Sequence, residues 1–173
     1  AAGCTVTGLD ASSDMLDALA AKDPDGLIRT VLGNAALPDE WPAGPFDVVV
    51  AAFNLLLNLQ SAEDQSRCIA AAADAVRPGG YVVVETAVPA LPSERQQRID
   101  VRHIDAASVV LIATDADPST GVITGQHIEL VDGEPVRLRP WQVHTCSPAD
   151  VDRWAASAGL VRVARWATWD AHS

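Results

Sequence analysis

The chain has 173 residues, of which 49% are hydrophobic and 20% are charged. This length and composition are typical of one globular domain and exclude an intrinsically disordered chain, which lacks enough apolar side chains to offset the entropy of ordering. The chain contains 12 Lys and Arg residues against 23 Asp and Glu residues, so its formal net charge is -11. That charge argues against nucleic acid or an anionic membrane surface as a partner, because both require clustered basic side chains.

The sequence carries no signal for a membrane span, a disulfide framework or a zinc site. No apolar run reaches the roughly 18 residues that a membrane-spanning helix requires. The three cysteines, Cys4, Cys68 and Cys146, lie far apart and form no C-x-x-C pair, so neither disulfides nor a metal site are expected. These observations predict a cytoplasmic protein.

The first half of the chain contains four predicted strands. Short apolar and β-branched runs between turn residues predict buried strands at residues 5–9, 27–32, 46–53 and 81–86. The run over residues 46–53 is apolar on both faces, which is typical of a strand at the centre of a parallel sheet.

Two helices are predicted between these strands. Ser12 or Ser13 caps the first helix, and its expected buried face carries Met15, Leu16 and Leu19. The second helix covers residues 63–76, and Ser61 with Asp64 forms its capping pattern. Strands that alternate with helices in this way predict a parallel α/β sheet.

The second half of the chain has a different pattern. Four strands without intervening helices are expected at residues 99–104, 108–114, 122–131 and 136–145, and Asp132-Gly133 predicts a tight hairpin between the last two. These strands indicate an antiparallel segment appended to the parallel sheet. A capped helix is predicted from Ser147 to Gly159, followed by a final strand over residues 161–169.

Four features occur in a fixed order along the chain. They are Asp10 at the end of the first strand, the turn Gly33-Asn34-Ala35, the strand that runs into Phe53-Asn54, and Arg77-Pro78-Gly79-Gly80 before another strand. In this order and spacing, the sequence resembles the class I S-adenosylmethionine-dependent methyltransferases, in a branch that acts on small molecules and is common in actinobacteria. The resemblance implies an incomplete Rossmann-like α/β sheet with an appended antiparallel β segment.

The resemblance also implies how the chain is divided. Residues 1–98 are expected to form a partial cofactor-binding core, residues 99–146 an insertion on the acceptor side, and residues 147–173 the rest of the core. The family's Gly-rich turn lies roughly 20 residues before the acid, and a closing strand follows the last one here. We therefore expect that a homo-oligomer, a second chain or another segment supplies two interior strands, which otherwise leave backbone groups unpaired.

The cofactor implied by the resemblance is S-adenosylmethionine. A carboxylate at the end of a parallel strand, such as Asp10, accepts hydrogen bonds from ribose hydroxyls, although the same geometry serves NAD or a helix cap. Asn34 offers a donor and an acceptor to an adenine edge, or is a turn residue. Met15 lines the adenine face or belongs to the core. The implied cofactor-binding residues are Asp10, Ala11, Met15, Asn34, Ala35, Phe53 and Asn54.

The expected reaction is methyl transfer to an oxygen or nitrogen of a small molecule. His103, His127 and His144 are candidates for a general base, because imidazole titrates near neutral pH. We select His127 as the catalytic candidate, with a purely structural role as the alternative. Two other functions stay open: a non-catalytic methyltransferase-like subunit that needs a partner chain, and a fragment of a nicotinamide-dependent oxidoreductase. The second is disfavoured because the chain contains no Tyr-x-x-x-Lys pair.

Overall fold

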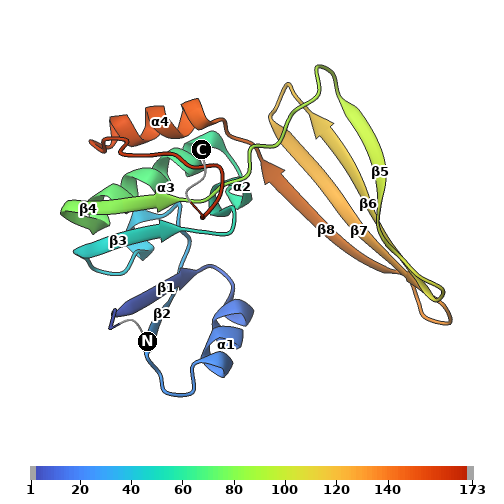
Figure 1. Cartoon of the computed structure of the whole chain (residues 1–173), viewed down its shortest axis with the longest axis horizontal. Coiled ribbons are helices and arrows are strands. Elements are labelled where there is room, and N and C mark those ends of the chain that lie inside the picture. Colours follow the sequence, from blue (N-terminus) through green and yellow to red (C-terminus); the bar gives the residue numbers. More distant parts are fainter. Residues whose placement is uncertain (1–2, 171–173) are drawn as a thin grey trace.

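The structure is a computed structural model that describes residues 3–170. It contains two bodies of secondary structure, a mixed α/β body and a long antiparallel sheet that extends from one side of it (Figure 1). Three sheets are formed: the parallel pair β1–β2, the parallel pair β3–β4, and a four-stranded antiparallel sheet. The α/β class and the appended antiparallel segment are therefore confirmed.

The first unit consists of β1 (Val6–Asp10), α1 (Ser13–Lys22) and β2 (Ile28–Leu32). The Ser12 hydroxyl accepts the Met15 N–H at 3.3 Å and so caps α1. The prediction that Met15 is buried is wrong, because its side chain is 60% exposed. Leu16 and Leu19 are the half-buried residues of α1, and none of its residues is fully buried.

The second parallel pair consists of β3 (Phe46–Ala51) and β4 (Val76–Val84). Their register shifts between Phe46 and Val48, where residues 77–80 loop out. The expectation that β3 is covered on both faces is wrong, since Val48 and Val50 are 48% and 52% exposed. Among the described residues β3 pairs only with β4, and α3 covers one of its faces while the other stays open.

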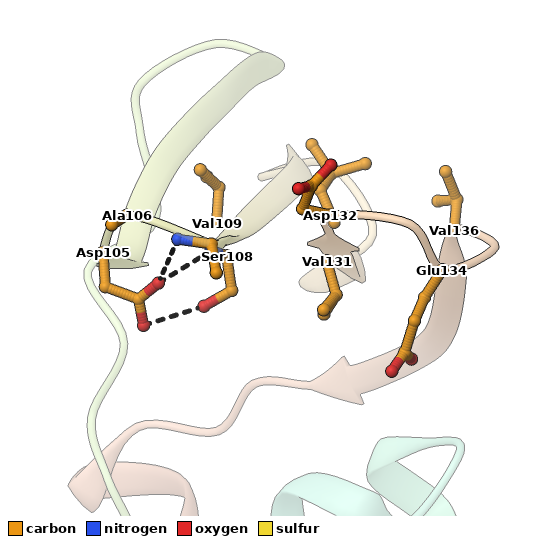
Figure 2. A pocket seen from close by; sticks show the side chains of 10 residues that line it. Asp105, Ala106, Ser108, Val109, Val131, Asp132, Glu134 and Val136 are labelled. Carbon is orange, nitrogen blue, oxygen red and sulfur yellow. Dashed lines mark hydrogen bonds between the residues drawn. The ribbon is translucent and has the colours of Figure 1, made fainter.

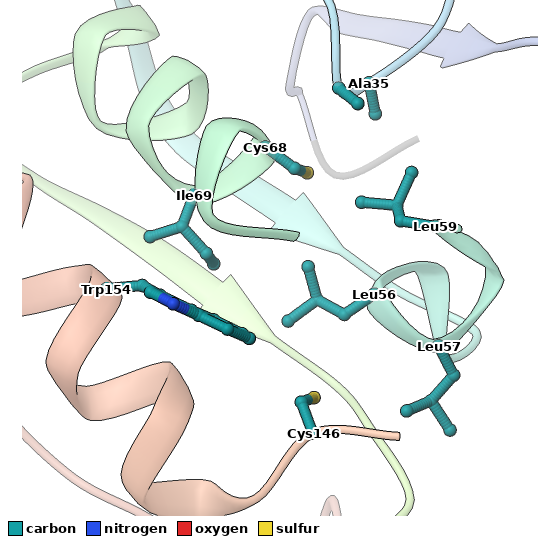
Figure 3. Close-up of a cluster of buried hydrophobic side chains, with 9 residues drawn as sticks. Ala35, Leu56, Leu57, Leu59, Cys68, Ile69, Cys146 and Trp154 are labelled. Carbon is teal, nitrogen blue, oxygen red and sulfur yellow. The ribbon is translucent and has the colours of Figure 1, made fainter. Parts of the chain in front are cut away.

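Three helices build the core beside this pair. They are α2 (Leu55–Asn58), which the sequence analysis did not predict, α3 (Ala62–Ala75) and α4 (Pro148–Ser157). Serine caps begin α3 and α4, and α4 has a complete capping box. Figure 3 shows side chains from all three helices converging on one apolar cluster, which includes Leu56, Ile69, Cys68, Cys146 and Trp154.

The antiparallel sheet has the strand order β5-β6-β7-β8. Its strands are β5 (Gln96–Ile104), β6 (Ser108–Asp117), β7 (Val122–Val131) and β8 (Arg137–His144). All four predicted strands are confirmed, with β5 and β6 longer than expected. β7 and β8 form the predicted hairpin, but residues 132–136 connect them, which is longer than the tight turn that Asp132-Gly133 predicts. Gly133 has a φ of 76°, and the Glu134 N–H donates to the Val131 carbonyl at 3.0 Å.

One buried amide contacts both the antiparallel sheet and the α/β body. Gln65 of α3 is fully buried, and its Nε2 donates to the carbonyl oxygens of Leu56 at 2.9 Å and His144 at 2.8 Å. A second amide contact joins Gln142 to Gln60 at 3.0 Å. The end of β8 is thereby held against α2 and α3.

The predicted final strand over residues 161–169 is absent from the structure. No described strand pairs with this segment, and Val161 and Val163 are 85% and 79% exposed. Two ion pairs hold the segment against α4 instead, from Arg162 and Arg165 to Asp152 at 2.9 and 2.7 Å. An apolar, β-branched sequence forms a strand only where a partner strand accepts its backbone hydrogen bonds.

The backbone is strained immediately after β3. Phe53 and Asn54 have φ values of 56° and 58°, so two consecutive non-glycine residues adopt the left-handed conformation, which costs roughly 1–2 kcal/mol for each. The Phe53 side chain is 90% exposed. Burial of the ring therefore does not offset the strain.

Within residues 3–170, no helix is long and apolar enough to cross a membrane.

The apolar cluster predicts a large difference between two isoleucines. Ile69→Ala should lower the free energy of unfolding by about 2–5 kcal/mol, because it opens a cavity around a side chain that is 1% exposed. Ile104→Ala is the matched control, since Ile104 is 69% exposed and its truncation should change the free energy by about 0.5 kcal/mol or less. Urea unfolding measures both, and equal losses would contradict the assigned core.

The strain at Phe53 predicts a stabilising substitution. Phe53→Gly should unfold with a free energy about 1 kcal/mol higher than Phe53→Ala, because glycine adopts the left-handed conformation without a Cβ clash. Phe53→Ala is the control, since it removes the same ring and keeps the strain. Equal unfolding free energies for the two variants in urea would show that the backbone at Phe53 is not strained.

Candidate active site

Polar side chains follow the ends of all four parallel strands. Asp10 ends β1, Asn34 follows β2, Asn54 follows β3 and Glu85 follows β4. Within each parallel pair the carboxyl ends lie at the same edge, and the arrowheads of β3 and β4 point toward the antiparallel sheet (Figure 1). Ligands of open α/β sheets bind at this edge.

Asp10 connects the ends of β1 and β2. Its Oδ1 accepts the N–H of Ser12 at 2.8 Å, and its backbone oxygen accepts the N–H of Gly33 at 3.0 Å. Ser12 is the N-cap of α1, so Asp10 does support the start of the helix. Its second carboxylate oxygen, Oδ2, has no hydrogen bond to any residue in the described part of the chain, and it is available to a ligand hydroxyl.

The turn after β2 uses part of the hydrogen-bonding capacity of Asn34. The side-chain Oδ1 accepts the N–H of Ala36 at 2.9 Å, and the Asn34 N–H donates to Glu40 at 2.6 Å. Ala35 is 9% exposed and belongs to the apolar cluster, while its carbonyl accepts the Trp41 indole N–H at 3.0 Å. Asn34 is thus a structural turn residue, whose amide Nδ2 is left for an external acceptor.

The left-handed pair after β3 is held by residues from the end of β4. The Phe53 N–H donates to Glu85 Oε2 at 2.8 Å, and the Ala87 N–H donates to Asn54 Oδ1. The Glu85 N–H donates to the Ala51 carbonyl at 2.9 Å. The structure therefore brings the predicted residues Phe53 and Asn54 together with Glu85. Glu85 is not among the predicted site residues, although it is an acid at the carboxyl end of a parallel strand, as Asp10 is.

His127 lies apart from this edge, on β7 of the antiparallel sheet. It pairs with Arg139, and its ring centroid is 6.2 Å from that of Trp141. Successive side chains of a strand point to opposite faces, so His127 and Trp141 lie on one face while Gln126 and Gln142 lie on the other. The role of His127 as a base stays a prediction.

A shallow hollow lies over the antiparallel sheet. Its volume is about 880 Å³. Its lining combines amides, a hydroxyl and a carboxylate with apolar side chains. The lining residues include Gln97, Ile99, Asp115, Thr124, Gln126 and Gln142. The Arg95 guanidinium lowers the pKa of the Asp115 carboxyl to about 2, so this carboxylate is ionised at neutral pH. His127 does not line the hollow.

A second hollow, of about 300 Å³, lies at the turns that join β5 to β6 and β7 to β8 (Figure 2). Asp105 accepts the Ala107 N–H and both the N–H and the hydroxyl of Ser108. A hydrogen bond from His103 contributes most to a pKa of Asp105 far below the usual range. Because the Ser108 hydroxyl donates to a carboxylate rather than to an imidazole, this cluster is not a nucleophile–base pair.

The two buried cysteines and the acidic residues add no further reactive centre. Burial raises the pKa of the Cys68 thiol to about 11 and also raises the pKa of Cys146, so neither is a thiolate near neutral pH. In residues 3–170, no group of three or more His, Cys, Asp or Glu side chains is placed to hold a metal ion. The chemistry of the chain is therefore concentrated at the strand ends and on the antiparallel sheet.

Comparisons with known proteins agree with this architecture. A model of the methyltransferase domain matches residues 1–84. The chain is 31% identical to the CcbJ methyltransferase from Streptomyces caelestis, with a TM-score of 0.89 over 99% of this chain and 70% of that one. No curated protein sequence matches the chain significantly.

Two more distant structures share the fold. One is CalS10 from Micromonospora echinaspora, an amino pentose methyltransferase with S-adenosylmethionine bound, at 21% identity and a TM-score of 0.68 over 89% of this chain and 65% of that one. The other is the sugar N-methyltransferase KedS8 from Streptoalloteichus sp, at 15% identity and a TM-score of 0.63 over 88% and 62%. The chain thus spans between 62% and 70% of the lengths of these three proteins.

The identity to CcbJ extends over almost the whole chain, the methyltransferase model covers β1 to β4, and the fold has polar residues at the ends of its parallel strands. The chain therefore belongs to the class I S-adenosylmethionine-dependent methyltransferases, and its cofactor is S-adenosylmethionine.

Proposed function

We propose that this chain transfers a methyl group from S-adenosylmethionine to an oxygen or nitrogen atom of a small-molecule acceptor. The observation that carries the proposal is the set of polar side chains at the strand ends, led by Asp10 with its unused Oδ2. The cofactor supplies a methyl group already activated on a sulfonium, so much of the acceleration can come from orientation and exclusion of water.

The residues at the strand ends fit the polar groups of this cofactor. Asp10 Oδ2 accepts from the ribose hydroxyls, and Asn34 Nδ2 donates to the adenine edge. Phe53 and Asn54 face the methionine end, where an exposed ring shields the reacting atoms from water. Ala11 and Met15 are exposed on the segment that follows β1, and they stay candidates for contacts with the nucleoside.

The acceptor is expected on the antiparallel sheet, within residues 99–146. The hollow over this sheet presents amides, a hydroxyl and an ionised carboxylate beside apolar side chains, a combination suited to a small polar molecule. The names of CalS10 and KedS8 describe sugar methyltransferases, and a sugar-like acceptor agrees with such a lining. His127 would remove an acceptor proton only if its face of the sheet meets the acceptor.

A non-catalytic subunit is the second candidate function. One observation favours it: β1–β2 and β3–β4 are separate pairs among the described residues, and Val48 and Val50 of β3 are half exposed. A second copy, another chain or another segment that pairs with these strands would cover them, and the activity would then belong to the assembly. For either function, we propose that the chain is located in the cytoplasm.

Calorimetric titration tests the cofactor assignment directly. S-adenosylhomocysteine should bind the chain, and NAD should not, because the chain belongs to a family that uses S-adenosylmethionine. Binding of NAD alone would overturn the proposal. Binding of neither ligand, alone or with a partner that co-purifies, would leave the non-catalytic subunit as the better interpretation.

Asp10→Ala tests the ribose contact. The variant should weaken binding of S-adenosylhomocysteine by about 1–3 kcal/mol, because charge-assisted hydrogen bonds from two hydroxyls are lost. Asp17→Ala is the control, since Asp17 is an exposed acid of α1 and removes the same charge. If both variants bind equally well in calorimetry, Asp10 does not belong to the site.

A further inference from the structure

Glu85 occupies a special position at the end of β4. Its side chain is half-buried, and its Oε2 accepts the Phe53 N–H across two neighbouring parallel strands. Its backbone N–H donates to Ala51, so the main chain of Glu85 continues the β3–β4 pairing while its side chain reaches beyond it. No other described residue accepts the Phe53 N–H.

The left-handed conformation of Phe53 makes this contact important. Phe53 lies beyond Ala51, the last residue of β3 that pairs with β4, and its N–H donates to no backbone carbonyl among the described residues. The Glu85 carboxylate accepts the Phe53 N–H. The Asn54 Oδ1 accepts the N–H of Ala87, which lies in the segment after β4. The two contacts lock the loop after β3 from both sides, although Phe53 itself is 90% exposed.

We propose that Glu85 is a positioning residue, which holds Phe53 and Asn54 in the conformation that presents them to the methyl donor. The ligand part of this inference rests on the proposed function, whereas the backbone part does not. Without the carboxylate the Phe53 N–H loses its acceptor, and the strained pair relaxes toward ordinary backbone conformations. The ring and the amide then leave the edge where the donor binds.

The small number of phenylalanines allows a specific test. The chain contains two, Phe46 and Phe53, so labelling with [15N]phenylalanine gives two backbone amide signals in a nuclear magnetic resonance spectrum. Phe46 lies at the start of β3 and is an internal reference. In Glu85→Ala the Phe53 signal should move and its hydrogen exchange should quicken by about tenfold or more, while Phe46 keeps its position.

Two further variants separate positioning from a general loss of structure. Glu85→Gln keeps an oxygen acceptor and should restore the slow exchange of Phe53 to within about threefold of the original chain. Glu94→Ala removes an exposed acid nearby in the sequence and should leave both signals unchanged. Unchanged Phe53 exchange in Glu85→Ala, or no restoration in Glu85→Gln, would overturn the proposal.

Addition of S-adenosylhomocysteine then tests the ligand part. It should move the Phe53 signal of the original chain far more than that of Phe46, and Glu85→Ala should bind it about tenfold more weakly at an unchanged thermal midpoint. If the original chain does not bind S-adenosylhomocysteine, the proposed function fails while the exchange result still stands. If Glu85→Ala binds as tightly as the original chain, Glu85 does not position the donor site.

Discussion

The arrangement of the two bodies depends on the buried amide of Gln65. The carbonyls of Leu56 and His144 come from α2 and from the end of β8, and each would be costly to bury without a donor. One NH2 group satisfies both, while the Gln65 Oε1 stays buried without a partner. An apolar side chain of similar size would leave the His144 carbonyl without this donor, while the Leu56 carbonyl would keep only the Leu59 N–H at 3.2 Å. Because α2 directly follows Phe53 and Asn54, the same amide also sets the antiparallel sheet against the active-site edge.

The strand ends of this protein are organised by two acids in the same way. Asp10 and Glu85 each follow a parallel strand, and each gives one carboxylate oxygen to a backbone N–H of a neighbouring loop. The bond from Ser12 begins a helix, and the bond from Phe53 holds a strained turn. In both cases the other oxygen has no hydrogen bond among the described residues. Each acid therefore organises the backbone with one carboxylate oxygen and keeps the other oxygen available for a ligand.

Local signals explain which elements were predictable from the sequence. The caps at Ser61 and Ser147 and the Asp132-Gly133 turn are decided by residues within one turn of the chain, so the corresponding helices and hairpin were confirmed. Residues 161–169 have the composition of a strand, but pairing depends on a neighbour that composition does not reveal. The exposure of Met15 likewise depends on what packs on α1. The contact of Glu85 with Phe53 joins residues 32 positions apart, beyond any local pattern.

The conformation at Phe53 is not explained by burial of its side chain. A left-handed, largely exposed phenylalanine contributes little burial and costs conformational energy, and such strain persists only where surrounding contacts over-determine it. Here those contacts come from Glu85 and Asn54, both at the edge where polar residues follow the parallel strands. Glycine would relieve the strain but would also remove the exposed ring, which the proposed function places beside the methyl donor. The strained turn therefore lies at the same edge of the parallel strands that we propose as the cofactor site.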